Sequence, residues 1–566
     1  MRLPIVCFCL LLQALAGFSQ MPAIYDVIIH EVMPKPTPVL GLPPNEYIEL
    51  KNISAVPVQL KNWHLMVNKR EVTLPAYLLQ PDSLLLLCAA AVADSYPIAN
   101  VLGVDHFPPL ADDSAMIVLY SPLHQVIHAL AYNQHWYGSH KGGVSLEMIN
   151  ALLPCSGKSN WTSSTASAGG TPGKPNAASA VITDPTLPDL LYVAIIDSLH
   201  LMLQFSKTLD SALAADPGHY QLSGGLQIRR VVVPPPLFNN VQLQLSAAIM
   251  PQQAYTLNAT GVADCYGAVS GLYNAATFGW PAKPEPGDVL FSEILFYPPP
   301  GVPEFIELYN NSFKVIDLKS LRVCAVKTNG SWGPVKQLAT ISRLLMPGQW
   351  LALTTDAAML CNCYNCLAPE SILEVSGLPS MPMEEGRLLL MRDDSMQLDE
   401  LHYTAQMHFP LFSELRGISL ERLQYQLPTS DGHNWHSAAA TVGYATPGWK
   451  NSQRWPAAGD SLNIVLSPAV FSPNGDGVDD KVRLSWQLPA PGYMANVTIF
   501  DIQGGAVRYL ARNMLIGNTG FLSWDGIGEN AVVLASGIYI FFVEIFNAAG
   551  EVKHWKHSVV MARKLE

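Results

Sequence analysis

The feature that most constrains this fold is an internal repeat that covers more than half of the 566 residues. Glu46–Ser54, read as EYIELKNIS, is matched later by Glu304–Ser312, read as EFIELYNNS. Further matches follow in the same order at a nearly constant offset: Gly143–Glu147 with Gly417–Glu421, Asn160-Trp161 with Asn434-Trp435, and Thr171–Gly173 with Thr446–Gly448. Because one structural unit underlies each copy, the chain is expected to be a series of domains.

The pattern within and between the motifs is typical of β-structure. Glu46–Leu50 alternates polar and apolar residues, as does a strand with one face in a core. The 40 Gly and 44 Pro are spread between short apolar runs, which indicates many turns. Thr-Pro-Gly at the end of each copy predicts a closing turn in which Gly adopts a positive φ. The length allows about three to five domains of ~100–150 residues, all of them β-rich.

These motifs resemble the lamin-tail domain, over residues 24–178 and 286–453. The resemblance implies an immunoglobulin-like β-sandwich for each copy, and hence a fold of tandem immunoglobulin-like β-sandwiches in a multidomain chain. His30 and Ser292 stand where the family usually has Asn, and Leu321 replaces the Trp63 type of residue. These changes are mild for packing.

Residues 182–276 lie between the copies. A strand ending in Phe205-Ser206, later strands such as Val241–Leu245, and Gly261–Gly267 (GVADCYG) follow one another in an order similar to the immunoglobulin-like domain of bacterial S-layer proteins. Such domains are usually spacers, so residues 182–276 are interpreted as one.

Residues 461–566 form the last predicted domain. Phe471–Asp480, read as FSPNGDGVDD, resembles the opening of gliding-motility-associated and flagellar-hook-cap-like C-terminal domains. Trp524–Gly526 and Ser536–Tyr539 extend the resemblance. It implies a sorting domain read by a type IX secretion system; a plain immunoglobulin-like terminal module is the alternative, since the chain does not end on a strongly basic stretch.

The same opening holds the predicted metal ligands, which are Asn474, Asp476, Asp479 and Asp480. Four oxygen-bearing side chains on a Gly-containing loop suit Ca²⁺, although no Glu completes an EF-hand. The alternative is an array of turns in which these side chains accept backbone N–H groups. No other cofactor is expected.

The first twenty residues have the form of a signal peptide: Arg2, an apolar stretch over Leu3–Ala16, and small residues up to Ser19. No later segment is apolar enough to span a bilayer. We therefore expect a protein that is secreted or held on the outer cell surface.

Charge and cysteine content narrow the partners. The net charge of −12 and the lack of a basic run argue against nucleic-acid binding. Seven cysteines follow the predicted signal peptide, an odd number. The cluster of Cys361, Cys363 and Cys366 is interpreted as disulfides or free thiols, with a metal site as the alternative.

No catalytic motif of the common hydrolase, metalloprotease or nucleotide-binding types is present. The repeated Glu31, Glu49, Glu293 and Glu307 allow a glycosidase interpretation, but a carboxylate kept in both copies of a scaffold is more often structural. His135–His140 and His433–His436 lack a nearby carboxylate cluster and are interpreted as packing residues.

The resulting hypothesis is a non-enzymatic scaffold or adhesion-type protein that presents lamin-tail sandwiches to a protein or glycan, with the C-terminal domain contacting the secretion machinery. The alternative is an accessory binding subunit of an extracellular hydrolase, a nuclease or a phosphatase. An enzyme site built in loops between domains is a third hypothesis.

Overall fold

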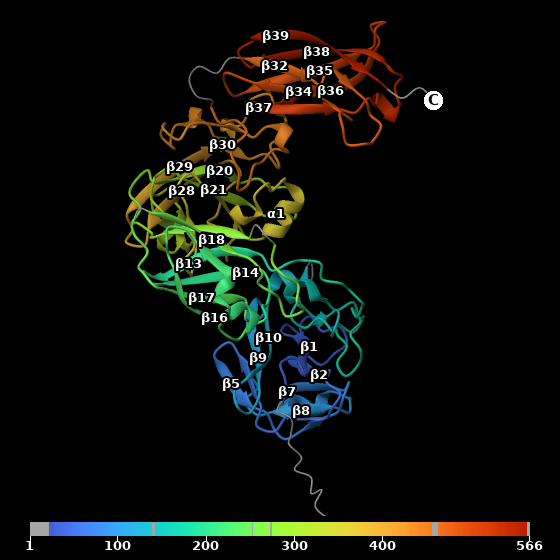
Figure 1. Cartoon of the computed structure of the whole chain (residues 1–566), viewed down its shortest axis with the longest axis vertical. Coiled ribbons are helices and arrows are strands. Elements are labelled where there is room, and N and C mark those ends of the chain that lie inside the picture. Colours follow the sequence, from blue (N-terminus) through green and yellow to red (C-terminus); the bar gives the residue numbers. More distant parts are fainter. Residues whose placement is uncertain (1–21, 139–141, 252, 272–273, 456–461, 563–566) are drawn as a thin grey trace, which may run out of the picture.

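The structure, a computed structural model, describes residues 22–138, 142–251, 253–271, 274–455 and 462–562. Its strands form four units that follow one another along the long axis of the molecule (Figure 1). The all-β prediction is confirmed: the one α-helix in the described residues is α1 (Ala357–Cys363), and the rest is strands, short 3-10 turns and loops. The predicted signal peptide lies outside the described residues.

The first unit, here called the first repeat, contains two main sheets. The six-stranded sheet has the order β12-β11-β1-β2-β7-β8 and the four-stranded sheet the order β10-β9-β4-β5. The strand bounds are β1 Val27–Met33, β2 Tyr47–Asn52, β3 Val58–Gln59, β4 His64–Val67, β5 Arg70–Thr73, β6 Leu78–Leu79, β7 Leu84–Ala89, β8 Val101–Val104, β9 Ser114–Tyr120, β10 Val126–Asn133, β11 Leu146–Met148 and β12 Trp161–Ser163.

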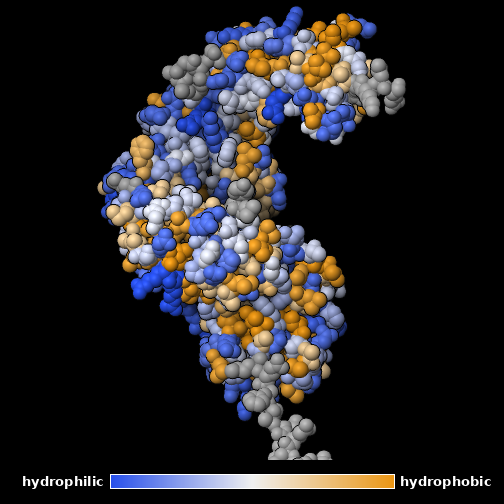
Figure 2. Space-filling model, viewed as in Figure 1, coloured by the Kyte–Doolittle hydropathy of each residue, from blue (hydrophilic) through white to orange (hydrophobic). Residues whose placement is uncertain are grey.

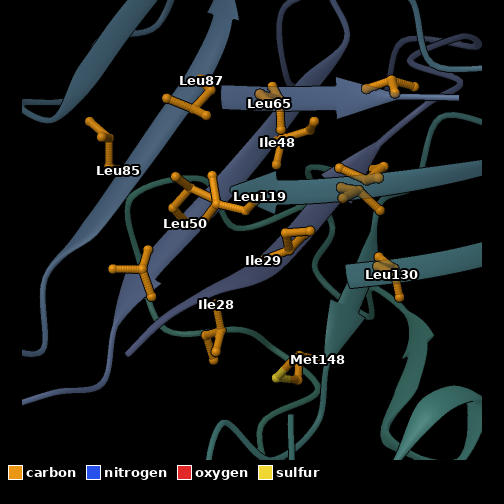
Figure 3. Close-up of a cluster of buried hydrophobic side chains, with 14 of the residues drawn as sticks. Ile28, Ile29, Ile48, Leu50, Leu65, Leu85, Leu87, Leu119, Leu130 and Met148 are labelled. Carbon is orange, nitrogen blue, oxygen red and sulfur yellow. The ribbon is translucent and has the colours of Figure 1, made fainter. Parts of the chain in front are cut away.

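The core of the first repeat lies between these two sheets. Ile29, Ile48 and Leu50 from one sheet pack against Leu65 and Leu119 from the other, and all five are fully buried (Figure 3). The prediction that Glu46–Leu50 has one face in the core is confirmed by Ile48 and Leu50, and Glu49 on the opposite face is equally buried. The segment that closes the domain covers that face, as described below.

The second repeat has the same plan. Its sheets have the orders β27-β26-β21-β20-β30-β31 and β24-β23-β28-β29, each strand matching one of the first repeat. The last strand of the long sheet runs parallel to its neighbour in both copies. The bounds are β20 Val289–Leu295, β21 Phe305–Asn310, β22 Ile316–Asp317, β23 Leu321–Ala325, β24 Lys336–Gln337, β25 Leu344–Leu345, β26 Trp350–Thr354, β27 Ile372–Glu374, β28 Glu385–Arg392, β29 Gln397–Thr404, β30 Leu420–Arg422 and β31 Trp435–Ser437.

The spacer domain lies between the repeats and has sheets of four and three strands, ordered β13-β14-β17-β16 and β15-β18-β19. Phe205, Tyr255 and Phe278 are central to its core, with the last two rings stacked 5.5 Å apart. Its final strand extends to Gly279, past the expected end at residue 276. The bounds are β13 Leu190–Asp197, β14 His200–Phe205, β15 Tyr220–Leu222, β16 Ile228–Val232, β17 Asn240–Leu245, β18 Ala254–Ala259 and β19 Ala275–Gly279.

The C-terminal domain has sheets ordered β32-β34-β37 and β33-β39-β38-β35-β36. Trp524 is buried against Phe471, Tyr539 and Phe541, so the aromatic residues of the sequence motifs form its core. The bounds are β32 Asn463–Ser467, β33 Val470–Phe471, β34 Val482–Gln487, β35 Tyr493–Phe500, β36 Ala506–Leu515, β37 Thr519–Trp524, β38 Gly537–Asn547 and β39 Val552–Met561.

On the face seen in Figure 2, hydrophobic residues are distributed over the whole length of the molecule. Over the described residues, none of the helices is both long and apolar enough to cross a membrane.

Candidate functional site

The loop after β11 joins the first repeat to the spacer domain. Cys155 in this loop is disulfide-bonded to Cys265 of the spacer, and its backbone N–H donates to Tyr266 Oη over 3.0 Å. Beside this junction Lys207 forms ion pairs with Asp264 at 2.6 Å and Asp184 at 3.0 Å, and all three side chains are almost fully buried. The spacer domain thus covers one face of the first repeat.

The corresponding face of the second repeat is open. It forms a cleft of about 1690 Å³ beside β28 and β29, bounded by the loop after β30. Leu427, Pro428 and Ser430 in this loop are exposed. This cleft is the candidate binding site.

Hydrogen bonds establish that the two faces correspond. Tyr25 N–H donates to Ile127 O over 2.8 Å in the first repeat, and Gly287 N–H donates to Leu398 O over 3.1 Å in the second. At the bulge in the first strand, Ile29 N–H donates to His128 Nδ1 and Phe291 N–H donates to Asp399 Oδ2. With this register, the following residues of the two faces pair: Tyr25 with Gly287, Ala129 with Glu400, Ala131 with His402, and Cys155 with Thr429.

The two faces therefore differ in chemistry although their backbones match. At three of these positions a small residue of the first repeat is replaced by a polar or charged residue in the second: Ala129 by Glu400, Ala131 by His402 and Cys155 by Thr429. Arg387 forms an ion pair with Glu400, and His402 Nε2 lies 2.7 Å from Glu385 Oε1. Because this face carries both positive and negative side chains, it suits a polar ligand whose own charged groups can replace one partner of these pairs.

Asp399 fixes the floor of the cleft. Its Oδ1 accepts from Thr429 Oγ1 over 2.6 Å, and Arg422 lies 3.7 Å from its Oδ2. Burial raises the pKa of Asp399 and lowers the pKa of Arg422 in spite of this attraction, because both groups are cut off from water. The pair therefore holds the loop in place and leaves the exposed rim free for a ligand.

The four predicted carboxylates lie elsewhere, in two buried trios. In the first repeat Glu31 pairs with Glu49 on one side and with Glu147 on the other across adjacent strands. In the second repeat Glu293 lies in the same way between Glu307 and Glu421. Glu147 and Glu421 were missed as members, although each ends the repeated Ser-Leu-Glu motif.

The closing Thr-Pro-Gly segment seals each trio. Thr171 donates through N–H to Glu31 and through Oγ1 to Glu147, while Gly173 N–H donates to Glu49. Thr446 and Gly448 repeat these contacts with Glu293, Glu421 and Glu307. Gly173 and Gly448 have φ of +73° and +74°, as predicted for the closing turn.

Burial dominates the protonation of these trios. Loss of water, with a smaller contribution from Glu49, raises the pKa of Glu31 to about 7. Burial likewise raises the pKa of Glu49 and of Glu293 to about 8, and it raises the pKa of Glu307 well above the ordinary value. All six carboxylates have no exposed surface, which leaves a glycoside no access. The structural interpretation of these residues is the one that fits their environment.

The predicted calcium ligands lie on one exposed loop, where they accept backbone donors. Asp480 accepts from Asn474 N–H, Gly475 N–H and Gly477 N–H, and these bonds lower its pKa. Asp476 Oδ1 accepts from Val478 N–H over 2.8 Å. Asp479 stands at a φ of +49°. This arrangement corresponds to the turn array, and calcium binding stays a prediction.

The cysteine cluster is divided between a bond and a thiol. Cys361 and Cys366 form a disulfide at the end of α1, and Cys363 is exposed and free. Asp356 caps the short helix there by accepting from Met359 N–H. The metal alternative for this cluster loses two of its three ligands to the disulfide.

The histidine segments give no assembled site. His436 is largely buried, lies 5.3 Å from the Phe409 ring and has a pKa lowered by burial, which agrees with a packing role. His433 N–H is bound by the Asp431 cap. Of the first segment, His140 and the side chain of His135 lie outside what the structure describes.

A second cleft, of about 1030 Å³, lies where the second repeat meets the C-terminal domain. Its lining includes Trp449, Trp455 and Phe521, each close to half exposed. The junction is held by Asn518, whose N–H donates to Ser452 O and whose Nδ2 donates to Arg454 O.

Comparison with known proteins gives distant likenesses. No family model matches the chain, and no curated protein matches it. A DUF4876 family protein from Bacteroides thetaiotaomicron is 12% identical with a TM-score of 0.20, over 38% of this chain and 90% of that one.

Two further solved structures are the N-terminal part of the bacterial S-layer protein SbsC and a Ca²⁺-stabilized adhesin of an Antarctic bacterium. The first is 13% identical with a TM-score of 0.17, over 39% of this chain and 44% of that one. The second is 9% identical with a TM-score of 0.12, over 96% of this chain and 100% of that one. This chain therefore spans less than half of the S-layer structure, and none of the three superposes closely enough to assign a family.

Proposed function

We propose that this chain is a non-enzymatic scaffold, secreted or held at the outer cell surface, that presents lamin-tail-type sandwiches to a protein partner. The partner binds in the cleft of the second repeat. The spacer orients the two repeats, and the C-terminal domain contacts the secretion machinery.

The observation that carries this proposal is the contrast between corresponding faces. The same face is covered by the spacer in the first repeat and open in the second. It bears Glu400 where the first repeat has the half-buried Ala129. Since charged residues are unfavourable at a face buried within the chain, the second copy is suited to meet a solvated partner.

A glycan is the second candidate ligand, and the other cleft favours it. Exposed aromatic rings provide stacking surfaces for sugars, and Gln426 and Gln487 add amide groups beside Trp449 and Trp455. The accessory-subunit hypothesis remains as well: a nuclease or phosphatase would then be the partner protein.

The test compares a blocked cleft with a blocked control surface in the full chain. Ser430→Trp places a large ring at the rim of the cleft, and Ser211→Trp does the same at an exposed turn of the spacer. Extracellular proteins captured by the wild-type chain are identified by mass spectrometry and remeasured one by one with purified partner, and a glycan array is probed in parallel.

We expect a partner protein whose binding is lost with Ser430→Trp and kept with Ser211→Trp. Binding that both variants keep would place the partner elsewhere and refute the proposal for this cleft. Turnover of a nuclease, phosphatase or glycosidase substrate by the purified chain would overturn the non-enzymatic assignment. Deleting residues 461–566 and comparing culture supernatant, cell surface and periplasm tests the sorting role.

A further inference from the structure

Three side chains converge on the outer side of the four-stranded sheet of the first repeat. Glu71 Oε1 lies 2.9 Å from His64 Nδ1 and 3.1 Å from His124 Nε2. The two imidazole rings have their centroids 4.0 Å apart. Among the described residues, this is the one group of three or more His, Cys, Asp or Glu whose ligand atoms all lie within 4.8 Å of one another.

The three residues come from different parts of the sheet. His64 begins β4, Glu71 is in β5, and His124 is in the turn between β9 and β10. Strand pairing puts His64 opposite Thr73 on one side and Tyr120 on the other, which brings the β5 strand and the turn to it. The turn is fixed, because His124 N–H donates to Ser121 O and Ser121 N–H to Gln125 O.

The second repeat shows that the fold does not need these side chains. By strand register, His64 corresponds to Arg322, Glu71 to Val335 and His124 to Ser395. The turn is kept in detail: His124 has a φ of +56° and Ser395 of +66°, and the Ser121–Gln125 bond is matched by Arg392–Met396. The same backbone therefore forms with Arg, Val and Ser, so the His, Glu and His are additions to it.

We propose that His64 Nδ1, Glu71 Oε1 and His124 Nε2 bind a divalent transition metal ion of the zinc class. Two imidazoles and one carboxylate are a ligand set that Zn²⁺ takes in tetrahedral sites whose fourth position holds water. With metal–ligand bonds of about 2.0–2.1 Å, neighbouring ligand atoms in a tetrahedron lie about 3.3 Å apart. The distances of 2.9 and 3.1 Å from Glu71 Oε1 to the two imidazole nitrogens are close to this value, so small rotations of the side chains suffice.

The exposure of the group also fits an open site. The side chain of His64 is 18% exposed, that of Glu71 39% and that of His124 55%. A metal ion can enter from solvent, and its remaining position faces water. The carboxylate oxygen shared by two imidazoles in the metal-free chain becomes a direct ligand, and the imidazoles bind as neutral rings.

The alternative is a surface cluster in which one carboxylate serves two histidines. Such pairs contribute little and hold no ion. The spacer domain offers a matched example: His200 Nδ1 lies 2.9 Å from both carboxylate oxygens of Asp197, and no third His, Cys, Asp or Glu ligand joins them among the residues that the structure describes. His200 is therefore the control position for a histidine–carboxylate pair without a metal site.

The test uses the full chain, freed of metal with a chelator and titrated with Zn²⁺ by calorimetry near neutral pH. We expect one site per chain. Removing a residue that only hydrogen-bonds to a metal ligand lowers metal affinity by about 10–100-fold. Removing a metal ligand itself should lower the affinity at least as much. Glu71→Gln and His124→Ala should therefore each weaken binding by about 100-fold or more, and His200→Ala should leave it unchanged. Co²⁺ should give the intense visible absorption of a tetrahedral centre in the wild type, and Glu71→Gln should lose it.

A wild-type chain that binds no Zn²⁺ stoichiometrically would overturn the proposal, as would binding that Glu71→Gln and His124→Ala both keep. Thermal melting of each variant checks that the domain still folds. Glu71→Gln keeps the size of the side chain, so it serves if His124→Ala disturbs the turn.

Discussion

Replacing Glu49 by Gln should remove a pH dependence that the buried trio imposes on the first repeat. Burial raises the pKa of Glu49 to about 8 from the ordinary value of 4.5, and lowers the pKa of its partner His30 to about 4. The two lie 3.2 Å apart as an ion pair would, yet both are buried, so between these values each is neutral. The protonated carboxyl then donates to His30 Nδ1.

The sign of the effect follows from proton binding. Between pH 4.5 and about 8 the folded chain holds a proton on Glu49 that the unfolded chain releases, so the stability present at low pH is lost as pH rises. The loss is about 1.4 kcal/mol per pH unit, or about 3–4 kcal/mol between about pH 5 and about pH 8. At about 2–4 °C per kcal/mol, the melting transition of this domain should fall by about 10 °C from this group.

Calorimetry of the full chain at about pH 5 and about pH 8 tests this expectation. Glu49→Gln keeps the shape and cannot ionise, so it should melt close to the wild type at the lower pH and clearly above it at the higher pH. Glu370→Gln, at an exposed position in the second repeat, is the control. An equal change of melting temperature with pH in wild type and Glu49→Gln would refute the reasoning, because Glu49 would then ionise in the folded chain as easily as in the unfolded one.

Three further expectations follow. The double variant Cys155→Ser, Cys265→Ser removes a disulfide that joins residues 110 positions apart, and in the chain-entropy model this lowers the free energy of unfolding by about 4–5 kcal/mol. Limited proteolysis should then cut between the first repeat and the spacer sooner than in the wild type. An unchanged digestion rate would contradict this expectation. Trp524→Ala should lower the stability of the C-terminal domain by about 3–5 kcal/mol, measured by denaturant unfolding, because this fully packed ring holds both sheets. Asp480→Ala should lower the melting temperature of the same domain by releasing three backbone donors; a rise in wild-type melting temperature on adding Ca²⁺ that Asp476→Ala abolishes would favour the calcium prediction instead.

The sequence predicted the β-class and the residues that fix the strands, because these leave local patterns. Leu50, Trp63 and Trp524 stand in apolar or aromatic motifs and are all buried. The buried side of Glu49 was not predicted, since alternation shows a polar face and cannot show that a distant closing segment covers it.

Contacts between segments that are far apart in the chain produce no recognisable pattern in the local sequence. The bond between Cys155 and Cys265 depends on how two domains dock, which spacing along the chain does not encode. His64, Glu71 and His124 are brought together by strand pairing and one turn, so no metal-binding spacing marks them. The candidate cleft likewise appears once the two repeats are compared as folded units.

The two repeats share side chains on the sheet that the closing segment covers, and they differ in side chains on the other sheet. The closing Thr-Pro-Gly segment covers the outer face of the six-stranded sheet and satisfies its carboxylates, so a change at one trio position leaves a buried partner unpaired. Among the residues that the structure describes, the outer side of the four-stranded sheet and its edge have no closing segment of this kind and no buried carboxylate trio. The differences at His64 and Arg322, and at Ala129 and Glu400, fall there. One backbone can therefore hold a metal ligand set in one copy and a charged cleft in the other, because both lie where exchange of side chains costs the fold little.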